Sequence, residues 1–356
     1  MNLTTPSEGT FGGPLPDGYR EFLDPTMDLN GKVILVTGGT GSFGKHFLQT
    51  VVQRYKPKRL IVFSRDEMKQ YELAQTLPTD KYPFMRYFIG DVRNADRLEM
   101  AMREVDYVIH AAAMKHVSIA EYNPFECIHT NVMGAENVVR AAIHNKVKRV
   151  IALSTDKAAN PVNLYGASKL ASDKIFTAAN NLSGSSGCRF AVVRYGNVVG
   201  SRGSVLTYFQ KLIEEGADHL PITDPRMTRF WITLQQGVNF VLSCMQIMRG
   251  GEIFVPKIPS MLMTEFALSL APHLPHKLIG IRPGEKIHEI MISSDDSRTT
   301  IDLGDRYVIQ PAFAWFSRTS YKEATPVAED FVYSSENNTE WLGRHDFGFY
   351  LKEAAR

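Results

Sequence analysis

Short apolar runs alternate with longer amphipathic segments from Lys32 onward, and this rhythm constrains the fold more than any other feature of the chain. Strands that are buried on both faces of a parallel sheet have this pattern, and the segments between them have the length of helices. The alternation predicts the α/β class, with a Rossmann-type doubly wound parallel sheet. The runs lie at residues 33–36, 60–63, 85–89, 107–113, 149–154 and 190–193, and two of the helices are expected at 135–144 and 164–179.

The rhythm changes after Gly200, where residues 201–229 are irregular and polar. A helix is expected at 234–248 and a short strand at 252–256, and both are expected to return to the main sheet. Residues 1–28 are expected to form a flexible extension or an arm that packs on a partner subunit. The predicted division is a flexible N-terminal extension (1–28), a Rossmann domain (29–200 plus about 230–257) and a smaller C-terminal substrate-binding domain (about 201–229 plus 258–356).

Charge and hydrophobicity exclude two functional classes. Lysine and arginine number 40 against 38 aspartates and glutamates, and 44% of the residues are hydrophobic. Such a profile excludes a disordered chain. It also argues against a dedicated nucleic-acid binder, because no excess of positive charge is available to neutralise phosphates.

The cysteines and the N-terminal segment indicate the compartment. Cys127, Cys188 and Cys244 lie far apart without a CxxC pair, which argues against a disulfide framework and a structural zinc site. No apolar run approaches the ~20 residues of a membrane span. Residues 1–30 have neither the basic nor the apolar region of a signal peptide. We expect a cytoplasmic protein without a metal and without membrane or nucleic-acid partners.

A glycine-rich turn, TGGTGSFG, follows the first strand directly and precedes a helix directly. In this context the first glycine permits a tight turn, the second lets the backbone approach a pyrophosphate, and the third lets the helix pack closely on the strand. The pyrophosphate then lies at a helix N-terminus, where free N–H groups and the dipole favour anions. The turn predicts a dinucleotide site. Its expected contacts are Gly38, Thr40, Gly41, Ser42, Phe43 and Gly44.

The end of the second strand indicates which dinucleotide is bound. Ser64 and Arg65 stand where the 2′-phosphate of NADP would lie, and a guanidinium suits a phosphate through charge-assisted hydrogen bonds. The alternative is that Arg65 is a surface residue and Asp66 binds the ribose of NAD. We expect NADP, with Asp91 near the adenine. The expected contacts beyond the turn are Ser64, Arg65, Lys69, Asp91, Val92, Ala111, Ala112, Ala113, Tyr165, Lys169 and Tyr195.

Tyr165 and Lys169 are spaced to share one face of a helix. A nearby ammonium favours the tyrosinate and lowers the pKa of the phenol, which can then take a proton from a hydroxyl that is being oxidised. The lysine can also bind the nicotinamide ribose. The pair follows the segment STDK at residues 154–157 by one strand and one turn, which favours a catalytic role over a solvated helix face.

Taken together, these motifs resemble the extended short-chain dehydrogenase/reductase superfamily over residues 32–335. The details are most similar to the UDP-N-acetylglucosamine 4,6-dehydratases that invert C5 and begin pseudaminic acid synthesis. Retaining sugar-nucleotide dehydratases have Asp-Glu where this chain has Asp156-Lys157, and a related set of polysaccharide-synthesis enzymes has Met where this chain has Tyr165. The motifs that carry the resemblance are TGGTGSFG, SRDE, GDV, HAAAMKHV, AEYNPFECIHTN, STDK, YGASK, RYGNV, IRPGEK and AEDFVYSSENN.

The resemblance implies a lyase reaction. Tyr165, with Lys169 and Thr155 nearby, removes the proton of the C4 hydroxyl while hydride passes from C4 to NADP⁺. Lys157 removes the C5 proton, which would require a lowered pKa, and protonated Asp156 donates to the departing C6 hydroxyl. Hydride then returns to C6, and C5 is protonated from the opposite face. The sequence leaves open which step Asp156 performs and which Lys157 performs.

The resemblance also implies the ligands and the assembly. The substrate is UDP-N-acetylglucosamine, and the protein is expected to be a homo-oligomer, either a dimer or a hexamer. The alternatives are a UDP-N-acetylhexosamine 4- or 5-epimerase on the same scaffold and an NADP-binding protein without activity. The arginines among the expected substrate contacts could instead form structural ion pairs. The expected substrate contacts are Lys115, Asn197, Arg226, Arg229 and Arg282.

Overall fold

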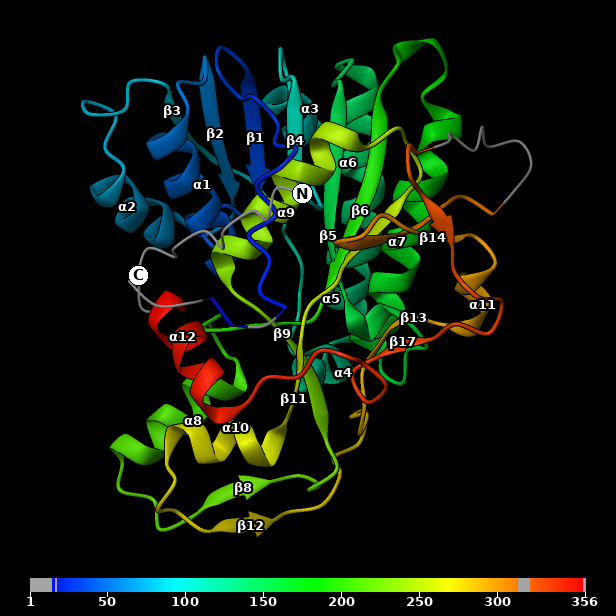
Figure 1. Ribbon diagram of the computed structural model, residues 1–356. Helices are drawn as coiled ribbons and strands as arrows, with labels where there is room; N and C mark the ends of the chain where they lie inside the picture. Colours follow the sequence, from blue (N-terminus) through cyan, green and yellow to red (C-terminus); the bar gives the residue numbers. More distant parts are fainter. Residues whose placement is uncertain (1–14, 17, 313–320, 355–356) are drawn as a thin grey trace, which may run out of the picture.

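The computed structural model describes residues 15–16, 18–312 and 321–354, and a ten-stranded sheet runs through its larger part (Figure 1). The strand order is β16-β14-β15-β10-β6-β5-β4-β1-β2-β3. The strands are β1 (Val33–Thr37), β2 (Arg59–Ser64), β3 (Met85–Ile89), β4 (Tyr107–His110), β5 (Arg149–Thr155), β6 (Arg189–Tyr195), β10 (Ile253–Pro256), β14 (Thr300–Asp302), β15 (Arg306–Ile309) and β16 (Thr325–Pro326).

In the strand order given above, all strands from β10 through β6, β5, β4, β1 and β2 to β3 are parallel to one another. The chain moves outward from β1 to β3 on one side and from β4 to β10 on the other, so the order reverses between β1 and β4. Every residue of β1 is buried, as expected for a strand covered on both faces. The predicted α/β class and doubly wound parallel sheet are confirmed. In such sheets, ligands bind beyond the carboxyl ends of the strands at the reversal point.

Helices cover both faces of the sheet (Figure 1). On one face, α1 (Ser42–Arg54) packs against α9 (Leu234–Ile247). On the other face, α6 (Gly134–His144) packs against α3 (Ala95–Ala101) and α7 (Leu164–Leu182). The other helices are α2 (Glu67–Thr76), α4 (Val117–Tyr122), α5 (Pro124–Ile128), the π-helix η1 (His129–Met133), the 3₁₀ helices η2 (Asp156–Ala158) and η3 (Gly184–Ser186), α8 (Val205–Glu214), α10 (Met263–Leu270), α11 (Ser294–Ser297) and α12 (Arg344–Ala354).

The far edge of the sheet differs from the predicted division of the chain. β15 pairs antiparallel with β10, and β14 and β16 continue the sheet beyond it. The assignment of residues 300–309 and 325–326 to the C-terminal domain is therefore wrong. These strands cover an edge that β10 would otherwise leave unpaired. They are only two to four residues long, so they carry no periodic signal in the sequence.

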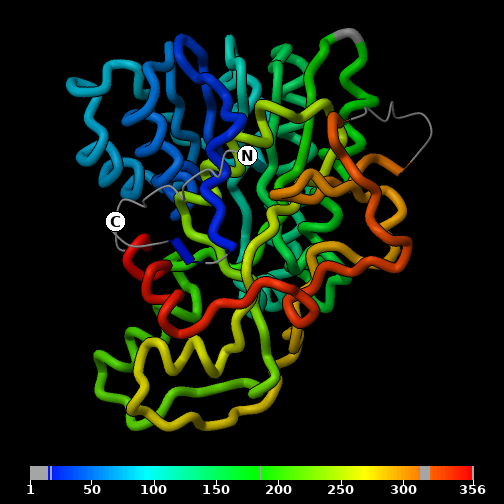
Figure 2. Tube along the Cα trace, in the orientation of Figure 1, coloured from blue at the N-terminus to red at the C-terminus, as the bar shows by residue number. Residues whose placement is uncertain are grey.

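A smaller lobe lies beneath the carboxyl edge of the sheet and combines segments from separate parts of the chain (Figures 1 and 2). β8 (Leu220–Ile222) pairs parallel with β12 (His276–Leu278), and α10 packs against α8 and α12. Its core includes Trp231, Phe266 and Phe347, with the first two rings stacked at 4.8 Å. The remaining strands are β7 (Asn197–Val198), β9 (Thr228–Ile232), β11 (Ser260–Leu262), β13 (Ile290–Ile292) and β17 (Tyr333–Ser334).

Part of the expected N-terminal extension packs on its own chain. Phe22 and Met27 are buried in the main core, and Arg20 forms an ion pair with Glu340 at 2.5 Å. The prediction of a flexible segment is therefore wrong for residues 18–28, whereas residues 1–14 and 17 lie outside the described residues. Among the helices in the described ranges, none has the length and hydropathy that a bilayer span requires.

Candidate active site

The glycine-rich turn lies at the carboxyl end of β1, where the strand order reverses. Gly38 has a φ of 66°, and a Cβ there would lie 2.7 Å from the backbone nitrogen of Ala112. A Cβ on Gly44 would lie 2.6 Å from the Gly38 carbonyl oxygen, so only glycine allows this close packing. α1 starts at Ser42 with Gly41 as its N-cap, and no side chain caps its N–H groups. The turn therefore fits a pyrophosphate, whose oxygens would accept hydrogen bonds from these groups.

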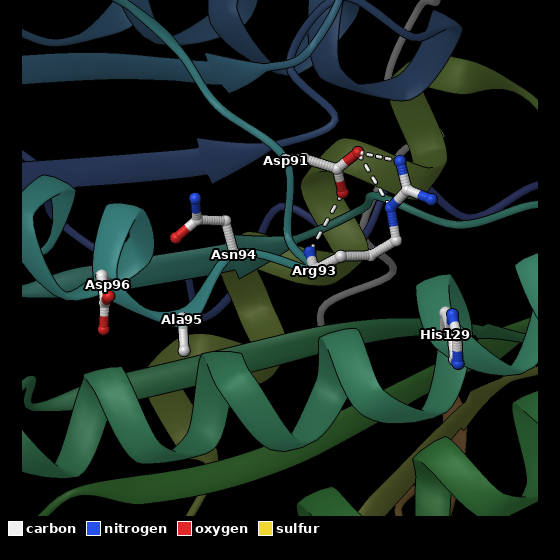
Figure 3. Close-up of a pocket in the computed structure, with 6 residues that line it drawn as sticks. All are labelled: Asp91, Arg93, Asn94, Ala95, Asp96 and His129. Atoms are coloured by element: carbon white, nitrogen blue, oxygen red, sulfur yellow. Dashed lines mark hydrogen bonds and ion pairs between the residues drawn. The ribbon is translucent and has the colours of Figure 1, made fainter.

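A pocket of about 590 Å³ lies beyond the carboxyl end of β3 and includes Asp91, the residue expected near the adenine (Figure 3). The Asp91 carboxylate accepts hydrogen bonds from Nε and Nη2 of Arg93 at 3.0 and 2.7 Å. Its Oδ2 also lies 3.6 Å from Nη1 of Arg65. Burial raises the pKa of Asp91, but the hydrogen bonds from Arg93 and the charges of both arginines outweigh it, so this pKa is lowered. Two guanidinium groups thus flank the expected adenosine end.

The side chains at the end of β2 differ in their exposure and in the hydrogen bonds and ion pairs that they already form within the protein. The Arg65 side chain is 61% exposed. Asp66, the alternative ribose ligand, caps α2 and forms an ion pair with Lys69 at 2.7 Å. Ser64 is buried, and its Oγ accepts a hydrogen bond from Nε2 of Gln70 at 3.1 Å. Arg65 is therefore the most accessible of the expected phosphate contacts.

The segment Thr155-Asp156-Lys157 lies at the carboxyl end of β5 and turns into η2. Asp156 is fully buried. Its Oδ1 accepts hydrogen bonds from Oγ1 of Thr155 at 2.9 Å and from Nζ of Lys157 at 3.0 Å. Its Oδ2 has no hydrogen-bond partner among the described residues. Burial raises the pKa of Asp156 by more than the charge of Lys157 lowers it, so this carboxyl tends to keep its proton.

Tyr165 and Lys169 lie one turn apart on α7, and both are buried. Burial raises the pKa of the Tyr165 phenol to about 12, although the charge of Lys157 and a hydrogen bond with Thr155 act to lower it. The expectation of a lowered pKa caused by Lys169 is therefore wrong. The Lys169 ammonium instead donates to the carbonyl oxygen of Leu153 at 2.7 Å. After burial, the charge of Lys157 has the largest effect on the pKa of the phenol.

Glu289, which was not predicted as a site residue, contributes a buried carboxylate to this cluster. It is 2% exposed, and its Oε1 lies 3.3 Å from Nζ of Lys157. Burial lowers the pKa of Lys157, but attraction to Asp156 and Glu289 outweighs it, so this pKa is raised. The expected lowering of the Lys157 pKa is therefore wrong. The sequence feature that could have identified Glu289 is its position shortly after Lys286, the last residue of the motif IRPGEK.

Arg229, an expected UDP contact, is buried beside Glu289. Its Nε lies 3.7 Å from Oε1 of that residue. Its other nitrogens donate to the backbone carbonyls of Thr228, Lys286 and Ile287, at distances between 2.7 and 3.0 Å. This arrangement is the structural ion pair that stood as the alternative for the arginine.

Arg226 and Arg282, the other two arginines expected at the UDP, are exposed. The Arg226 side chain is 68% exposed and pairs with Asp224 at 2.8 Å. The Arg282 side chain is 59% exposed, and its Nε lies 3.9 Å from Glu285. Both guanidinium groups remain accessible to an anionic ligand.

The loop that follows β7 joins the cofactor turn to the expected sugar site. The backbone nitrogen of Arg202 donates to Oγ of Ser42 at 3.0 Å, and its carbonyl oxygen accepts from Nζ of Lys115 at 2.7 Å. Asn197 lies in β7, beside β9. Tyr195 ends β6 and pairs in register with Thr155. The fold therefore brings the glycine-rich turn, the segment Thr155-Asp156-Lys157 and Lys115 to the same end of the sheet.

The match to a protein family agrees with this arrangement. Residues 34–311 match the family described as "Polysaccharide biosynthesis protein". The chain belongs to this family. It is 59% identical over 325 residues to a UDP-N-acetylglucosamine 4,6-dehydratase (inverting) of Campylobacter jejuni subsp. jejuni, which covers 89% of this chain and 96% of that protein. The resemblance inferred from the motifs is confirmed.

Two further proteins are less similar in sequence to this chain. The chain is 44% identical over 285 residues to a UDP-glucose 4-epimerase of Rickettsia canadensis, over 78% of this chain and 82% of that protein. The crystal structure of Pen from Bacillus thuringiensis has a TM-score of 0.84 and 38% identity, and it covers 92% of this chain and 99% of that one. Both similarities span most of each chain, and the structural one covers almost the whole fold.

Proposed function

We propose that the protein is an NADP-dependent UDP-N-acetylglucosamine 4,6-dehydratase, a hydro-lyase that inverts C5. The observation that carries this proposal is the ion pair between the buried Asp156 and the half-buried Lys157, which lies beside Tyr165 at the carboxyl end of β5. An elimination needs an acid and a base close together, whereas a simple oxidation at C4 needs only one proton acceptor. The 59% identity to a protein named as such a dehydratase supports the same reaction.

In the proposed mechanism, Tyr165 accepts the proton of the C4 hydroxyl. Burial raises the pKa of its phenol to about 12, and Lys157 and Thr155 act against this rise. The bound dinucleotide supplies a hydride acceptor and later a hydride donor. Lys157 takes the proton from C5, which the C4 ketone has made acidic. Asp156 gives its proton to the departing C6 hydroxyl, so water leaves. The two protons taken by Tyr165 and Lys157 balance the one given by Asp156 and the one returned to C5.

The test of this proposal is the reaction itself. The protein is incubated with UDP-N-acetylglucosamine in deuterated water, and the product is analysed by mass spectrometry and NMR. We expect the loss of one water molecule, deuterium at C5 and an inverted configuration at that carbon. A product with unchanged mass apart from deuterium would contradict the lyase proposal and support an epimerase. The observation that supports an epimerase is the 44% identity to a protein named UDP-glucose 4-epimerase.

We propose the remaining contacts from the positions of the side chains. The glycine-rich turn would hold the pyrophosphate of the dinucleotide, and Lys169 would bind the nicotinamide ribose. Lys115 and Asn197 would line the sugar pocket, with the exposed Arg226 and Arg282 at the UDP. The product would enter pseudaminic acid synthesis, a destination that rests on the motif resemblance alone.

Arg65 is the residue on which the preference for NADP would depend. Replacing it with alanine is expected to weaken NADP binding by about tenfold or more, because hydrogen bonds between charged groups contribute about 1.5–3 kcal/mol. NAD binding is expected to change by less than about twofold, since NAD lacks the 2′-phosphate that Arg65 would contact. Isothermal titration calorimetry with both dinucleotides measures the two affinities.

Arg59→Ala is the matched control for this measurement, because Arg59 lies at the opposite end of the same strand and pairs with Glu104. It should leave both affinities unchanged. An equal loss of NADP and NAD affinity in Arg65→Ala would contradict the proposed phosphate contact.

We also propose that the protein is a cytoplasmic homo-oligomer, either a dimer or a hexamer. The side chains of Ile119, Tyr122 and Phe125, on α4 and α5, are 50%, 87% and 77% exposed, which favours an interface at these helices. The cysteines Cys127 and Cys188 are free and buried, in keeping with a reducing compartment. Sedimentation velocity measures the assembly state directly.

A further inference from the structure

Glu289 and Asp156 both contact the Lys157 ammonium. The Lys157 Nζ is 3.0 Å from Oδ1 of Asp156 and 3.3 Å from Oε1 of Glu289. The two carboxylates come from distant parts of the chain, since Asp156 begins η2 whereas Glu289 precedes β13. Both are almost completely buried. The ammonium is therefore held between a carboxylate of the Rossmann sheet and one of the C-terminal region.

The backbone of Glu289 is fixed independently of its carboxylate. Its N–H donates to Oγ of Ser335 at 2.9 Å, and its carbonyl oxygen accepts from the Ser335 N–H at 2.8 Å. The Ser335 hydroxyl is in turn 2.7 Å from Oγ1 of Thr228. Because the main chain is held on both sides, a change in the carboxylate alone should leave the strand in place.

The charges around Glu289 keep it ionised although it is buried. Burial raises its pKa, but the charges of Lys157, Arg229 and Lys286 outweigh this effect, and the pKa is lowered. The Lys286 Nζ lies 4.0 Å from Oε2, an oxygen that has no hydrogen-bond partner among the described residues. The charge on Glu289 also contributes to the raised pKa of Asp156.

We propose that Glu289 is a positioning residue: its charged carboxylate fixes the Lys157 amine against Asp156 and sets the protonation of that pair. This inference rests on the proposed dehydratase function, in which Lys157 must lose a proton and Asp156 must carry one. Glu289 acts through these two residues. The groups that face the pair are Glu289, Arg229 on β9, Lys286 before β13, and Thr155 and Tyr165 from β5 and α7.

The direction of the pKa changes in a Glu289 variant follows from the negative charge that is removed. Replacing Glu289 with glutamine removes a negative charge and keeps the size of the side chain. The pKa of Lys157 should fall, so the amine becomes neutral at lower pH. The acid limb of the profile of rate against pH therefore moves to lower pH. The pKa of Asp156 should also fall, so this carboxyl loses its proton at lower pH. The alkaline limb of the profile therefore also moves to lower pH. The whole profile should move to lower pH.

The first measurement is kcat for water loss as a function of pH in the wild type and in Glu289→Gln. We expect a shift of about one pH unit or more to lower pH, the size that a charge within about 4–6 Å produces. A role confined to folding would lower kcat at every pH without moving the limbs. Glu336→Gln is the matched control, because Glu336 makes an ion pair with His288 in the same region and should leave the profile unchanged.

The second measurement needs neither substrate nor cofactor. The rate at which acetic anhydride acylates Lys157 at constant pH reports the fraction of neutral amine, and the Lys157 side chain is 27% exposed. Mass spectrometry compares this rate with that of Lys148, which is paired with Asp106 at the surface. One pKa unit corresponds to about a tenfold change in neutral amine, so acylation of Lys157 should be about tenfold faster in Glu289→Gln.

The two measurements separate this inference from the proposed function. If the wild type removes no water from UDP-N-acetylglucosamine, the dehydratase proposal fails and the acylation ratio decides the role of Glu289 by itself. An acylation rate equal in the wild type, Glu289→Gln and Glu336→Gln would overturn the inference, as would a pH profile that does not move in an active Glu289→Gln variant. Glu289→Ala is the less informative variant, because it also removes packing beside Arg229.

Discussion

Replacing Lys157 with alanine is expected to lower the rate of water loss from UDP-N-acetylglucosamine by about 10²–10⁴-fold, the usual contribution of a positioned acid or base. Oxidation at C4 should continue, because the proposed proton acceptor for that step is Tyr165. The variant should therefore form a 4-keto sugar that retains its C6 hydroxyl. The molar amount of this sugar should not exceed the molar amount of the enzyme. Rapid quenching followed by mass spectrometry measures this product.

The fold should survive this substitution. Asp156 already has a raised pKa, so it can take up a proton when the neighbouring ammonium is removed. NADP affinity should remain within about twofold of the wild type, since a side chain at the sugar end of the site leaves the glycine-rich turn intact. Lys148→Ala, which removes an exposed lysine, is the control and should keep the normal rate. Normal dehydration by Lys157→Ala would exclude the proposed role of Lys157.

Replacing Tyr165 with phenylalanine is expected to stop the reaction one step earlier. The ring remains and the hydroxyl is lost, so the C4 proton has no acceptor and kcat should fall by about 10²–10⁴-fold. In contrast to Lys157→Ala, this variant should release unchanged substrate, with neither a 4-keto sugar nor deuterium at C5. The same quench experiment distinguishes the two variants.

Tyr195→Phe provides the control for the loss of a buried phenol. Tyr195 ends β6 beside Thr155, and burial raises its pKa as it does that of Tyr165. The proposed chemistry requires no proton from Tyr195, so a moderate change in kcat is expected. A loss as large as that of Tyr165→Phe would mean that the two phenols share the role assigned to Tyr165.

The turn residues show how far sequence reasoning extends. Gly38 and Gly44 were expected where only glycine fits, and in the structure a Cβ at either position would lie within 2.7 Å of backbone atoms. This prediction succeeds because the strand, turn and helix are consecutive in the chain. The spacing of Tyr165 and Lys169 was accessible for the same reason, since one helix carries both residues.

The charge states of the groups around Lys157 could not be predicted in this way. The pKa of Lys157 was expected to be lowered, and it is raised because Glu289 approaches from a segment far away in the sequence. Arg229 was expected at the UDP, but its guanidinium lies against Glu289 and three backbone carbonyls. Both cases concern groups whose partners are brought near only by the folding of the C-terminal region onto the sheet.

The sequence by itself determined the parallel sheet, its glycine-rich turn and the identity of the residues around Asp156, because local periodicity and consecutive motifs carry that information. Only the tertiary structure decided that β14 to β16 complete the sheet and that Glu289 joins the Lys157 cluster. The physical reason is that strand pairing and buried charge pairs depend on distances between segments that are far apart along the chain. Burial then decides which protonation each group prefers, and burial is a property of the folded molecule.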